Sequence, residues 1–464
     1  MSSRTPASET AAAAAAATQG GGGTSEPLPQ RIGKYPVQAK IGEGATSEVF
    51  LADDPFRGHP VAIKRVRRSA LVDAREAHFQ KRFFAAEAAL VGRLHHPNVV
   101  QILDAVSEGE ELPYLVMEHV SGGTLRRYCR ADSLLPLAQV IEIGFKCAMA
   151  LAYCWRQGLI HRDVKPANLL AVLDGDRIVD VKISDFGSVF NSGADITQVH
   201  RVGSLAYMSP EQLDGDQVDC RADIYSLSAV LYHLVAGRPP FDATEQRAIM
   251  YQIFNATPPP LAALREGVPA ALAGLIERGL AKDREARPAD WEAFAQALSQ
   301  LASARVVPHG AQQAVLDSER FTLLRAQEFF ARFGDVELWE VVHRAKWARH
   351  SFGQALYRRG EAGNTFHILT EGEVEVFRDG LLVARLGAGT SVGEMAYLAP
   401  SPELRTHSAD VLVSRPATTV SFTPESLGQL SLTTVHAFDK AFIGVLVRRL
   451  HAAHEALAHP RRIL

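Results

Sequence analysis

The hydrophobic pattern of this chain changes its period along the sequence, and the changes divide it into parts. Short apolar runs at 35–41, 49–52 and 61–66 predict strands, and further short strands are expected up to residue 118. A helical period covers 72–94, and after Pro136 the chain is predicted to be mostly helical as far as residue 301. A strand lobe followed by a helical lobe is an α+β arrangement with a cleft between the lobes.

A second change of pattern begins after residue 301. Residues 302–320 are polar and interrupted by Pro and Gly, which predicts a linker, and 321–347 have a helical pattern. From Phe352 the period becomes two, with glycines at close intervals, which predicts a small sandwich or barrel. An amphipathic helical stretch at 424–457 follows, so residues 321–464 are expected to form a separate small domain. The first 30 residues are low in complexity, and we expect them to be disordered.

Composition limits the classes of function. A length of 464 residues suggests two or three domains, and a net charge of -3 gives no reason to expect nucleic acid or an anionic membrane as a partner. The four cysteines lack zinc-ligand spacing and fit a reducing cytosol, so we expect a cytoplasmic protein. The apolar segment 140–155 is shorter than the ~18–20 residues of a membrane span and carries Glu142 and Lys146. The N-terminus has no signal-peptide pattern.

A glycine-containing turn directly follows the first predicted strand. Gly42 and Gly44 would let the backbone approach a polyphosphate closely enough for its N–H groups to bind the oxygens. An ordinary hairpin with two glycines is an equally good interpretation of this segment alone, since Ser47 stands where a third glycine is usual. The residues that follow are therefore needed to distinguish a phosphate-binding loop from an ordinary hairpin.

Charged residues appear after it in the order that phosphate chemistry requires. Lys64 ends a strand one hairpin later, and Glu87 in the next helical stretch can fix the position of that lysine. Asp163 lies in the segment His-Arg-Asp-Val-Lys-Pro-Ala-Asn, and Asp185 begins Asp-Phe-Gly. With Asn168 these carboxylates offer one group for an acceptor hydroxyl and oxygen ligands for Mg²⁺. The set is most improbable as an accident of structure.

On these motifs, residues 31–301 resemble the eukaryotic-like Ser/Thr protein kinases. The resemblance implies a bilobal fold and ATP as the phosphate donor. Lys64, paired with Glu87, would hold the α- and β-phosphates. Asp163 would accept the proton of the substrate hydroxyl, and Lys165 would steady the γ-phosphate. Two residues would hold Mg²⁺, or Mn²⁺ in its place, namely Asn168 and Asp185.

The resemblance also implies an adenine pocket. Residues 114–120 resemble the hinge between the lobes, with Met117 as gatekeeper and the backbone of Glu118 and Val120 bonded to the adenine edge. The remaining residues expected around the nucleotide are Ile41, Gly42, Glu43, Gly44, Val49, Ala62 and Leu170. For Val49, Ala62 and Leu170, each considered singly, plain core packing is the more common explanation.

Further motifs imply a platform for a peptide and a control loop. Glu211, at the end of the activation segment, would pair with Arg287, and Asp223 would brace the catalytic loop. We expect Thr197 to be an activating autophosphorylation site, because it lies in the middle of the loop and Arg162 can pair with a phosphate. An ordinary polar loop residue is the alternative.

Residues 321–457 resemble the cyclic-nucleotide-binding domains, which predicts a small β-roll with flanking helices. In that family Glu394 would accept from the ribose 2′-hydroxyl, and an arginine shortly afterwards would neutralise the cyclic phosphate. Here His407 occupies the arginine's position, and Arg405 lies two residues early. Histidine is mostly neutral at pH 7 and lacks the fork of an arginine. Two alternatives follow: a cyclic-nucleotide site, or a domain that has lost it and docks proteins.

Three functions are compatible with these residues. The first is an active kinase for protein substrates whose output is tuned by the C-terminal domain, through a cyclic nucleotide or a protein regulator. The second is an inactive scaffold, which the complete set of charged groups disfavours. The third is a kinase of small molecules, which the complete activation segment disfavours.

Overall fold

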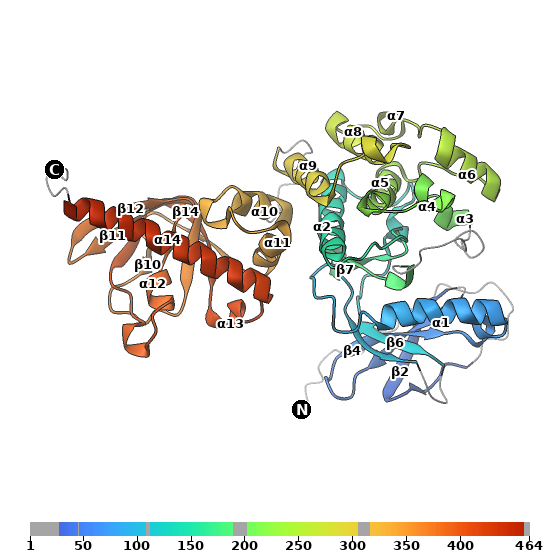
Figure 1. The fold of residues 1–464 in the computed structure, drawn as a ribbon, viewed down its shortest axis with the longest axis horizontal. Coiled ribbons are helices and arrows are strands. Elements are labelled where there is room, and N and C mark those ends of the chain that lie inside the picture. The colour runs from blue at the N-terminus through green and yellow to red at the C-terminus, as the bar shows by residue number, and fades with distance from the viewer. Residues whose placement is uncertain (1–26, 45, 108–111, 189–201, 305–315, 459–464) are drawn as a thin grey trace, which may run out of the picture.

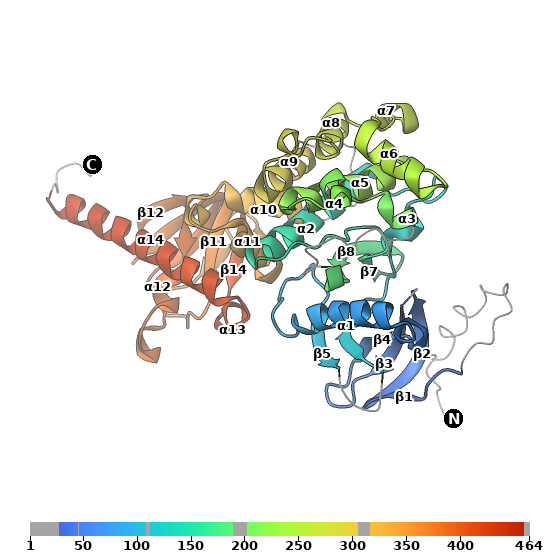
Figure 2. The ribbon, with the colours of Figure 1, turned by 45° about the vertical axis from the view of Figure 1, so that its right-hand side comes forward.

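The computed structural model describes residues 27–44, 46–107, 112–188, 202–304 and 316–458. Figures 1 and 2 show a β-rich lobe, a helical lobe beside it, and a third, β-containing part crossed by the long helix α14 (Leu432–Ala458). The expected bilobal α+β fold followed by a small β domain is therefore confirmed. Thr197, the expected autophosphorylation site in the activation loop, lies outside the described residues.

The N-terminal lobe is an antiparallel sheet with helix α1 (Ala74–Ala88) beside it. Its strands follow one another in space as β1 (Arg31–Ile32), β2 (Tyr35–Glu43), β3 (Ser47–Asp53), β4 (Pro60–Val66), β6 (Tyr114–Glu118) and β5 (Ile102–Val106). On β4 the period of two places Val61 and Ile63 in an apolar core with Phe50. The alternate face carries Ala62 and Lys64, which directs the lysine away from that core.

The helical lobe is built around α2 (Leu137–Arg156). Other helices of this lobe are α3 (Val202–Leu205), α4 (Pro210–Asp214), α5 (Cys220–Ala236), α6 (Gln246–Asn255), α7 (Leu261–Leu264), α8 (Ala270–Gly279) and α9 (Trp291–Ser303). By length and composition alone α2 could cross a membrane, but 83% of its most apolar window is buried inside the protein. A hairpin of β7 (Leu169–Asp174) and β8 (Arg177–Ile183) lies between α2 and the other lobe (Figure 1).

The C-terminal domain begins earlier than the sequence pattern predicts. Helix α10 (Asp317–Arg325) starts inside the expected linker. The single helical stretch expected at 321–347 is wrong: α10 is followed by a 3-10 turn, by α11 (Asp335–Arg344), and by strand β9 (Lys346–His350). Gly334 immediately precedes α11, and the rings of Phe330 and Phe333 turn inward to meet Phe438 on α14. Packing of these rings, rather than helical propensity, sets the break.

The β-roll of this domain has strand order β10 (Ala355–Tyr357), β14 (Asp410–Phe422), β11 (Phe366–Arg378) and β12 (Leu381–Gly387). Strand β13 (Ser391–Val392) pairs with β11, and β9 pairs with β14. Two short helices, α12 (Glu394–Tyr397) and α13 (Pro424–Leu427), precede α14. Buried Leu369, Val374 and Val413 fill the roll. Leu369 and Val374 are an odd number of positions apart on β11, and register shifts between them allow both side chains to face the core.

One apolar core connects the helical lobe with the C-terminal domain. It extends from Leu90 through α2 and α9 to Phe366 in the roll and Val445 on α14. At the junction, the ring centroid of Phe145 on α2 lies 5.4 Å from that of Phe321 and 5.2 Å from that of Trp339. The C-terminal domain is therefore packed onto the helical lobe through α10 and α11.

Candidate active site

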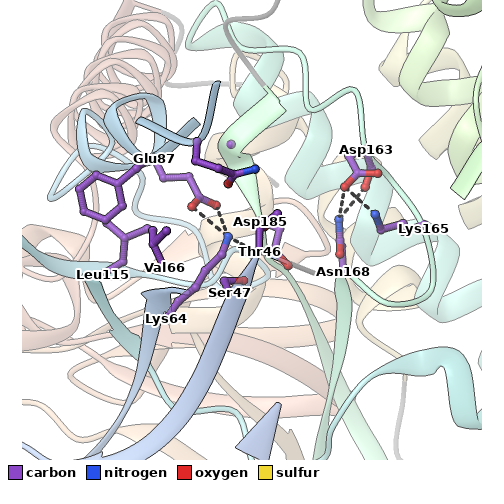
Figure 3. A pocket seen from close by; sticks show the side chains of 13 residues that line it. Thr46, Ser47, Lys64, Val66, Glu87, Leu115, Asp163, Lys165, Asn168 and Asp185 are labelled. Atoms are coloured by element: carbon purple, nitrogen blue, oxygen red, sulfur yellow. Dashed lines mark hydrogen bonds and ion pairs between the residues drawn. The ribbon is translucent and has the colours of Figure 1, made fainter. Parts of the chain in front are cut away.

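A cavity of about 200 Å³ lies between the two lobes. Charged, hydroxyl and amide groups from both lobes line it (Figure 3): Thr46, Ser47, Lys64, Glu87, Asp163, Lys165, Asn168 and Asp185, with Val66, Gln80, Phe84, Leu115 and Gly187. The cleft that the sequence predicted is present, and it brings together the six side chains expected to act on phosphate or metal, although Gly42 and Gly44 of the glycine turn do not line it. Polyanions with bound cations are the ligands that such a lining suits.

Lys64 is the centre of the charge network on the N-lobe side. Its ammonium lies 2.9 Å from both carboxylate oxygens of Glu87 and 2.6 Å from Oδ1 of Asp185. Burial alone would lower the pKa of Lys64, but the two carboxylates outweigh it and raise that pKa. Burial acts oppositely on Asp185, and the attraction of Lys64 more than compensates, so the pKa of Asp185 is lowered. The pair of Lys64 with Glu87 is the one that the sequence predicted, and Asp185 joins it as a third group.

Asp163 and its neighbours form a second group on the opposite wall (Figure 3). Oδ2 of Asp163 accepts hydrogen bonds from Nζ of Lys165 at 2.8 Å and from Nδ2 of Asn168 at 2.9 Å. The same Nδ2 also donates to the Asp163 carbonyl at 2.8 Å. These bonds fix the carboxylate while leaving it at the edge of the cavity, which is the geometry of a general base.

The backbone is held in an uncommon conformation both next to Asp163 and at Asp185. Arg162 has φ 62° and Asp185 has φ 66°, both in the left-handed region that non-glycine residues seldom occupy. The predicted brace is present: the buried carboxylate of Asp223 accepts from the N–H groups of His161 at 2.7 Å and Arg162 at 2.8 Å. Strain of this kind persists only where the surroundings impose it, and it concentrates at functional sites.

Phe186 keeps Asp185 facing the cavity. Its ring is buried and lies 4.8 Å, centroid to centroid, from the imidazole of His161, whose Nε2 is 3.0 Å from the carbonyl of Ser184. Strand β8 ends two residues before Asp185, so the position of the strand determines where the Asp185 carboxylate lies.

The residues expected around adenine do not line this cavity. Strand pairing places Ala62 opposite Met117, and Val49 opposite both Gly42 and the cavity-lining Lys64. Leu170 forms a bridge with Thr124, while Ile41 is 47% exposed and Val120 lies just past the end of β6. The described cavity is therefore the phosphate and metal end of the cleft.

The hinge is fixed by Glu118. Its N–H donates to the carbonyl of Gln101 at 3.0 Å, and its carboxylate accepts from Lys182 at 2.8 Å and from the Gln101 N–H at 3.0 Å. The side chain of Glu118 thus serves the scaffold, leaving recognition of a ligand to the backbone.

Arg67 was missed by sequence reasoning. It contacts Oε1 of Glu43 at 2.8 Å and donates to the carbonyl of Gly44 at 3.2 Å, while Lys40 binds the other oxygen of Glu43 at 2.8 Å. Glu43 is thus bound by two cations, and the position of Gly44 is fixed through its backbone carbonyl. The only signal was the short run of basic residues at 64–68, for which solvated charge at the end of a strand is the better explanation from the sequence alone.

Behind the loop, the predicted platform is assembled. Arg287 is fully buried and binds both oxygens of Glu211, at 2.6 and 2.9 Å. Gln212 on the same short helix, α4, donates to the carbonyl of Arg162 at 2.9 Å, which joins the platform to the catalytic loop. Nζ of Lys165 also lies 3.5 Å from Oγ of Ser204.

In the C-terminal domain, Glu394 begins α12 and is buried. One oxygen of its carboxylate is bound by Arg449 of α14, whose other nitrogen donates to the carbonyl of Ser391 at 2.8 Å. No motif in the sequence indicated a role for Arg449, because the pattern of this segment predicts only an amphipathic helix. One of the two oxygens that would accept from a ribose hydroxyl is therefore held by the protein's own C-terminal helix, and the other is buried without a partner among the described residues.

The place expected for a cyclic phosphate does not fit an anion. His407 is buried, its ring lies 3.8 Å from that of Tyr357, and burial lowers its pKa, so the imidazole is neutral. A Cβ at Gly363 would lie 2.6 Å from Cβ of Ala396 and 2.8 Å from His407, so this corner of the roll is already filled. Arg405 is exposed and donates to the carbonyl of Ala399 at 3.3 Å.

Comparison with known proteins agrees with this division of the chain. The family model of the protein kinase domain matches residues 35–300, and that of the cyclic nucleotide-binding domain matches 349–433. A serine/threonine-protein kinase PknB of Mycobacterium leprae is 37% identical over 266 residues, which are 56% of this chain and 41% of the relative. PknB of Mycobacterium tuberculosis is 36% identical over 299 residues, covering 63% of this chain and 46% of the relative. The chain thus spans less than half the length of these curated relatives.

Proposed function

Because this chain belongs to the protein kinase family, we propose that it transfers the γ-phosphate of ATP to serine and threonine hydroxyls of proteins. The observation that carries the proposal is the intact network of the cavity: Lys64 joined to Glu87 and Asp185, facing Asp163 with Lys165 and Asn168. An inactive scaffold would not need to keep every one of these charges aligned. Relatives of this family named as serine/threonine kinases support the choice of acceptor.

The residues of the cavity fit ATP with a divalent cation. Asp185 and Asn168 present oxygens to the cavity and would hold Mg²⁺ or Mn²⁺, which neutralises the phosphates when bound. Lys64 would bind the α- and β-phosphates, kept in place by Glu87. Asp163 orients the acceptor hydroxyl and takes its proton, and Lys165 offsets the charge that develops on the transferred group. Catalysis is mainly positioning and charge neutralisation.

We further propose that a phosphate on the activation loop switches the site on. Arg162 precedes Asp163, and its Nε and Nη1 are buried without a hydrogen-bond partner among the described residues. A guanidinium in this state would gain two charge-assisted bonds from a phosphate. Thr197, in the segment outside the described residues, is the candidate residue to accept that phosphate from ATP and carry it after autophosphorylation.

Phosphopeptide mapping after incubation of the full chain with ATP and Mg²⁺ is expected to find phosphate on Thr197. Thr197→Ala should then lower the rate of transfer to a protein acceptor by about tenfold or more, the size expected when charge-assisted bonds that order a loop are lost. Ser192→Ala, in the same loop, is the matched control and should behave as the wild type. An unmodified Thr197 in a chain that is fully active would refute this part of the proposal.

We propose that the C-terminal domain regulates the kinase by contact rather than through a cyclic nucleotide. The contact is extensive, since one core continues from α2 into the roll. The alternative, nucleotide gating, is favoured by the family match and by Glu394 at the start of α12. It is opposed by the neutral, buried His407 and by the engagement of Glu394 with Arg449.

Titration of the full chain with cyclic AMP and cyclic GMP by calorimetry is expected to give no saturable heat up to ~1 mM, because no fixed cation meets the phosphate. Phosphate transfer should be equally unaffected by either nucleotide. Saturable binding that disappears in Glu394→Gln or Arg405→Ala would instead establish nucleotide gating. Arg359→Ala, at an exposed pair with Asp379, controls for a general loss of positive charge.

A further inference from the structure

Two contacts reach from the C-terminal domain into the segments that carry Asp185. The first is a hydrogen bond from the indole Nε1 of Trp339, on α11, to Oδ1 of Asn98 at 3.0 Å, and both side chains are fully buried. Asn98 lies in the loop that leads from α1 to β5. The bond therefore spans 241 positions and crosses from one domain to the other.

Asn98 passes this contact on to strand β8. Its Nδ2 donates to Oδ1 of Asp180 at 2.6 Å and to the carbonyl of Val181 at 2.8 Å. The backbone of the same loop pairs with the end of β8: Ile183 N–H donates to the Asn98 carbonyl at 2.9 Å, and its carbonyl accepts from Val100 at 2.8 Å. Trp339 thus determines which way the Asn98 amide faces, because it occupies the oxygen and leaves the nitrogen for β8.

The second contact meets the first at Asp180. Lys146 on α2 is buried and lies 2.9 Å from Oδ2 of Asp317 on α10 and 3.1 Å from Oδ1 of Asp180. It also donates to the Val179 carbonyl at 3.2 Å. Burial alone would lower the pKa of Lys146, but Asp180 and Asp317 outweigh it and raise that pKa, so the lysine is charged. Helices α10 and α11 therefore both hold residues 179–181 of β8.

Strand β8 ends at Ile183, and Asp185 follows two residues later with a left-handed backbone. Because the connection is short and strained, the position of strand β8 determines the position of the Asp185 carboxylate. We propose that Trp339 is a positioning residue for the metal and nucleotide site, acting through Asn98 and β8 on Asp185. The C-terminal domain is then a structural part of the catalytic machinery, which gives a regulator bound to this domain a physical route to the cavity.

Packing is the simpler explanation of Trp339, since its ring lies 5.2 Å from that of Phe145 and 4.4 Å from that of His343. The two explanations differ in what the Nε1–H does. Packing needs the ring alone, whereas positioning needs the hydrogen bond to Asn98. Trp339→Phe keeps an aromatic ring in the core and removes the donor, and it therefore separates them.

The experiment measures wild type, Trp339→Phe and Trp347→Phe in the full chain. Trp347 is the matched control, because its indole donates to the Val342 carbonyl at 3.4 Å within the C-terminal domain. Three quantities are compared: the affinity for ATP with Mg²⁺ by calorimetry, the KM and kcat of phosphate transfer, and hydrogen exchange of the peptide covering 178–187. The first and third do not depend on catalysis.

For Trp339→Phe we expect the Kd and KM for ATP with Mg²⁺ to rise about fivefold, the scale of one buried hydrogen bond. We also expect faster exchange at Val181 and Ile183, and a smaller change in kcat than in KM. Trp347→Phe should leave all three unchanged. If Trp339→Phe keeps the wild-type affinity and exchange, or if Trp347→Phe reproduces its defects, Trp339 only packs and the inference is wrong.

The inference rests on the proposed kinase activity, but the two fail separately. A wild-type chain that binds ATP with Mg²⁺ and transfers no phosphate would refute the activity, while affinity and exchange would still decide the role of Trp339. Asp317→Asn provides a second variant through the other contact. Lys146 is shared by the carboxylates of Asp317 and Asp180, and this variant removes the charge of the first. It should therefore produce the same faster exchange at 178–187.

Discussion

Asp163→Asn is expected to reduce phosphate transfer by about 10³-fold while leaving the affinity for ATP with Mg²⁺ within about a factor of three of the wild type, because an amide cannot accept the proton of the acceptor hydroxyl. Asn matches the shape of Asp, so the contacts of Oδ2 with Lys165 and Asn168 lose their charge but not their geometry. Single-turnover assays with radiolabelled ATP and calorimetric titration measure the two quantities.

The control for this substitution is Asp174→Asn, at the exposed end of β7 beside the turn into β8. It makes the same chemical change outside the cavity and should transfer phosphate at the wild-type rate. If Asp163→Asn retained transfer within about tenfold of the wild type, Asp163 would not be the base, and the role of the whole second group in the cavity would have to be reconsidered.

Glu211→Gln is expected to destabilise the chain by roughly 3 kcal/mol, because it leaves the guanidinium of Arg287 buried without its counter-charge. Arg287 has no exposed side-chain surface and binds both oxygens of Glu211. Glu285→Gln is the matched control: Glu285 is 63% exposed where it meets Arg221, and exposed pairs contribute at most about 1 kcal/mol. The midpoints of thermal unfolding compare the two.

The defect of Glu211→Gln should depend on pH. Burial would raise the pKa of Glu211, but Arg287 outweighs it and holds that pKa below its usual value of 4.5. A depressed carboxyl pKa contributes stability above the unfolded-state pKa, and this contribution is lost as the pH falls through the folded-state pKa. The wild type and Glu211→Gln should therefore converge in acid. Equal stability of the two at pH 7 would contradict the importance of the pair.

The sequence was sufficient where chemistry depends on a few residues in order. The motifs around Lys64, Asp163 and Asp185 predicted the shared cavity, and the pairs Lys64–Glu87 and Arg287–Glu211 were predicted and are present. Period-two strands similarly predicted β2, β3 and β4 to within a few residues. In each case the information is local, or it is carried by residue types that phosphate chemistry restricts.

The residues that were missed act through contacts between distant segments. Arg449 reaches Glu394 across 55 positions, and Trp339 reaches Asn98 across 241. Neither side chain stands in a distinctive motif, because a buried tryptophan and a helical arginine are ordinary residues on amphipathic helices. The break at Gly334 was missed for the same reason, since it depends on Phe330 and Phe333 meeting α14.

The most direct test of the proposed activity is transfer of labelled phosphate from ATP by the purified full chain, with Mg²⁺, to itself and to a general protein acceptor. We predict label on serine and threonine, identified by mass spectrometry, which is abolished by chelating the metal and falls about 10³-fold in Asp163→Asn. ATP binding without transfer to any acceptor, under conditions where the chain is folded, would contradict the proposal and make the protein a nucleotide-binding scaffold.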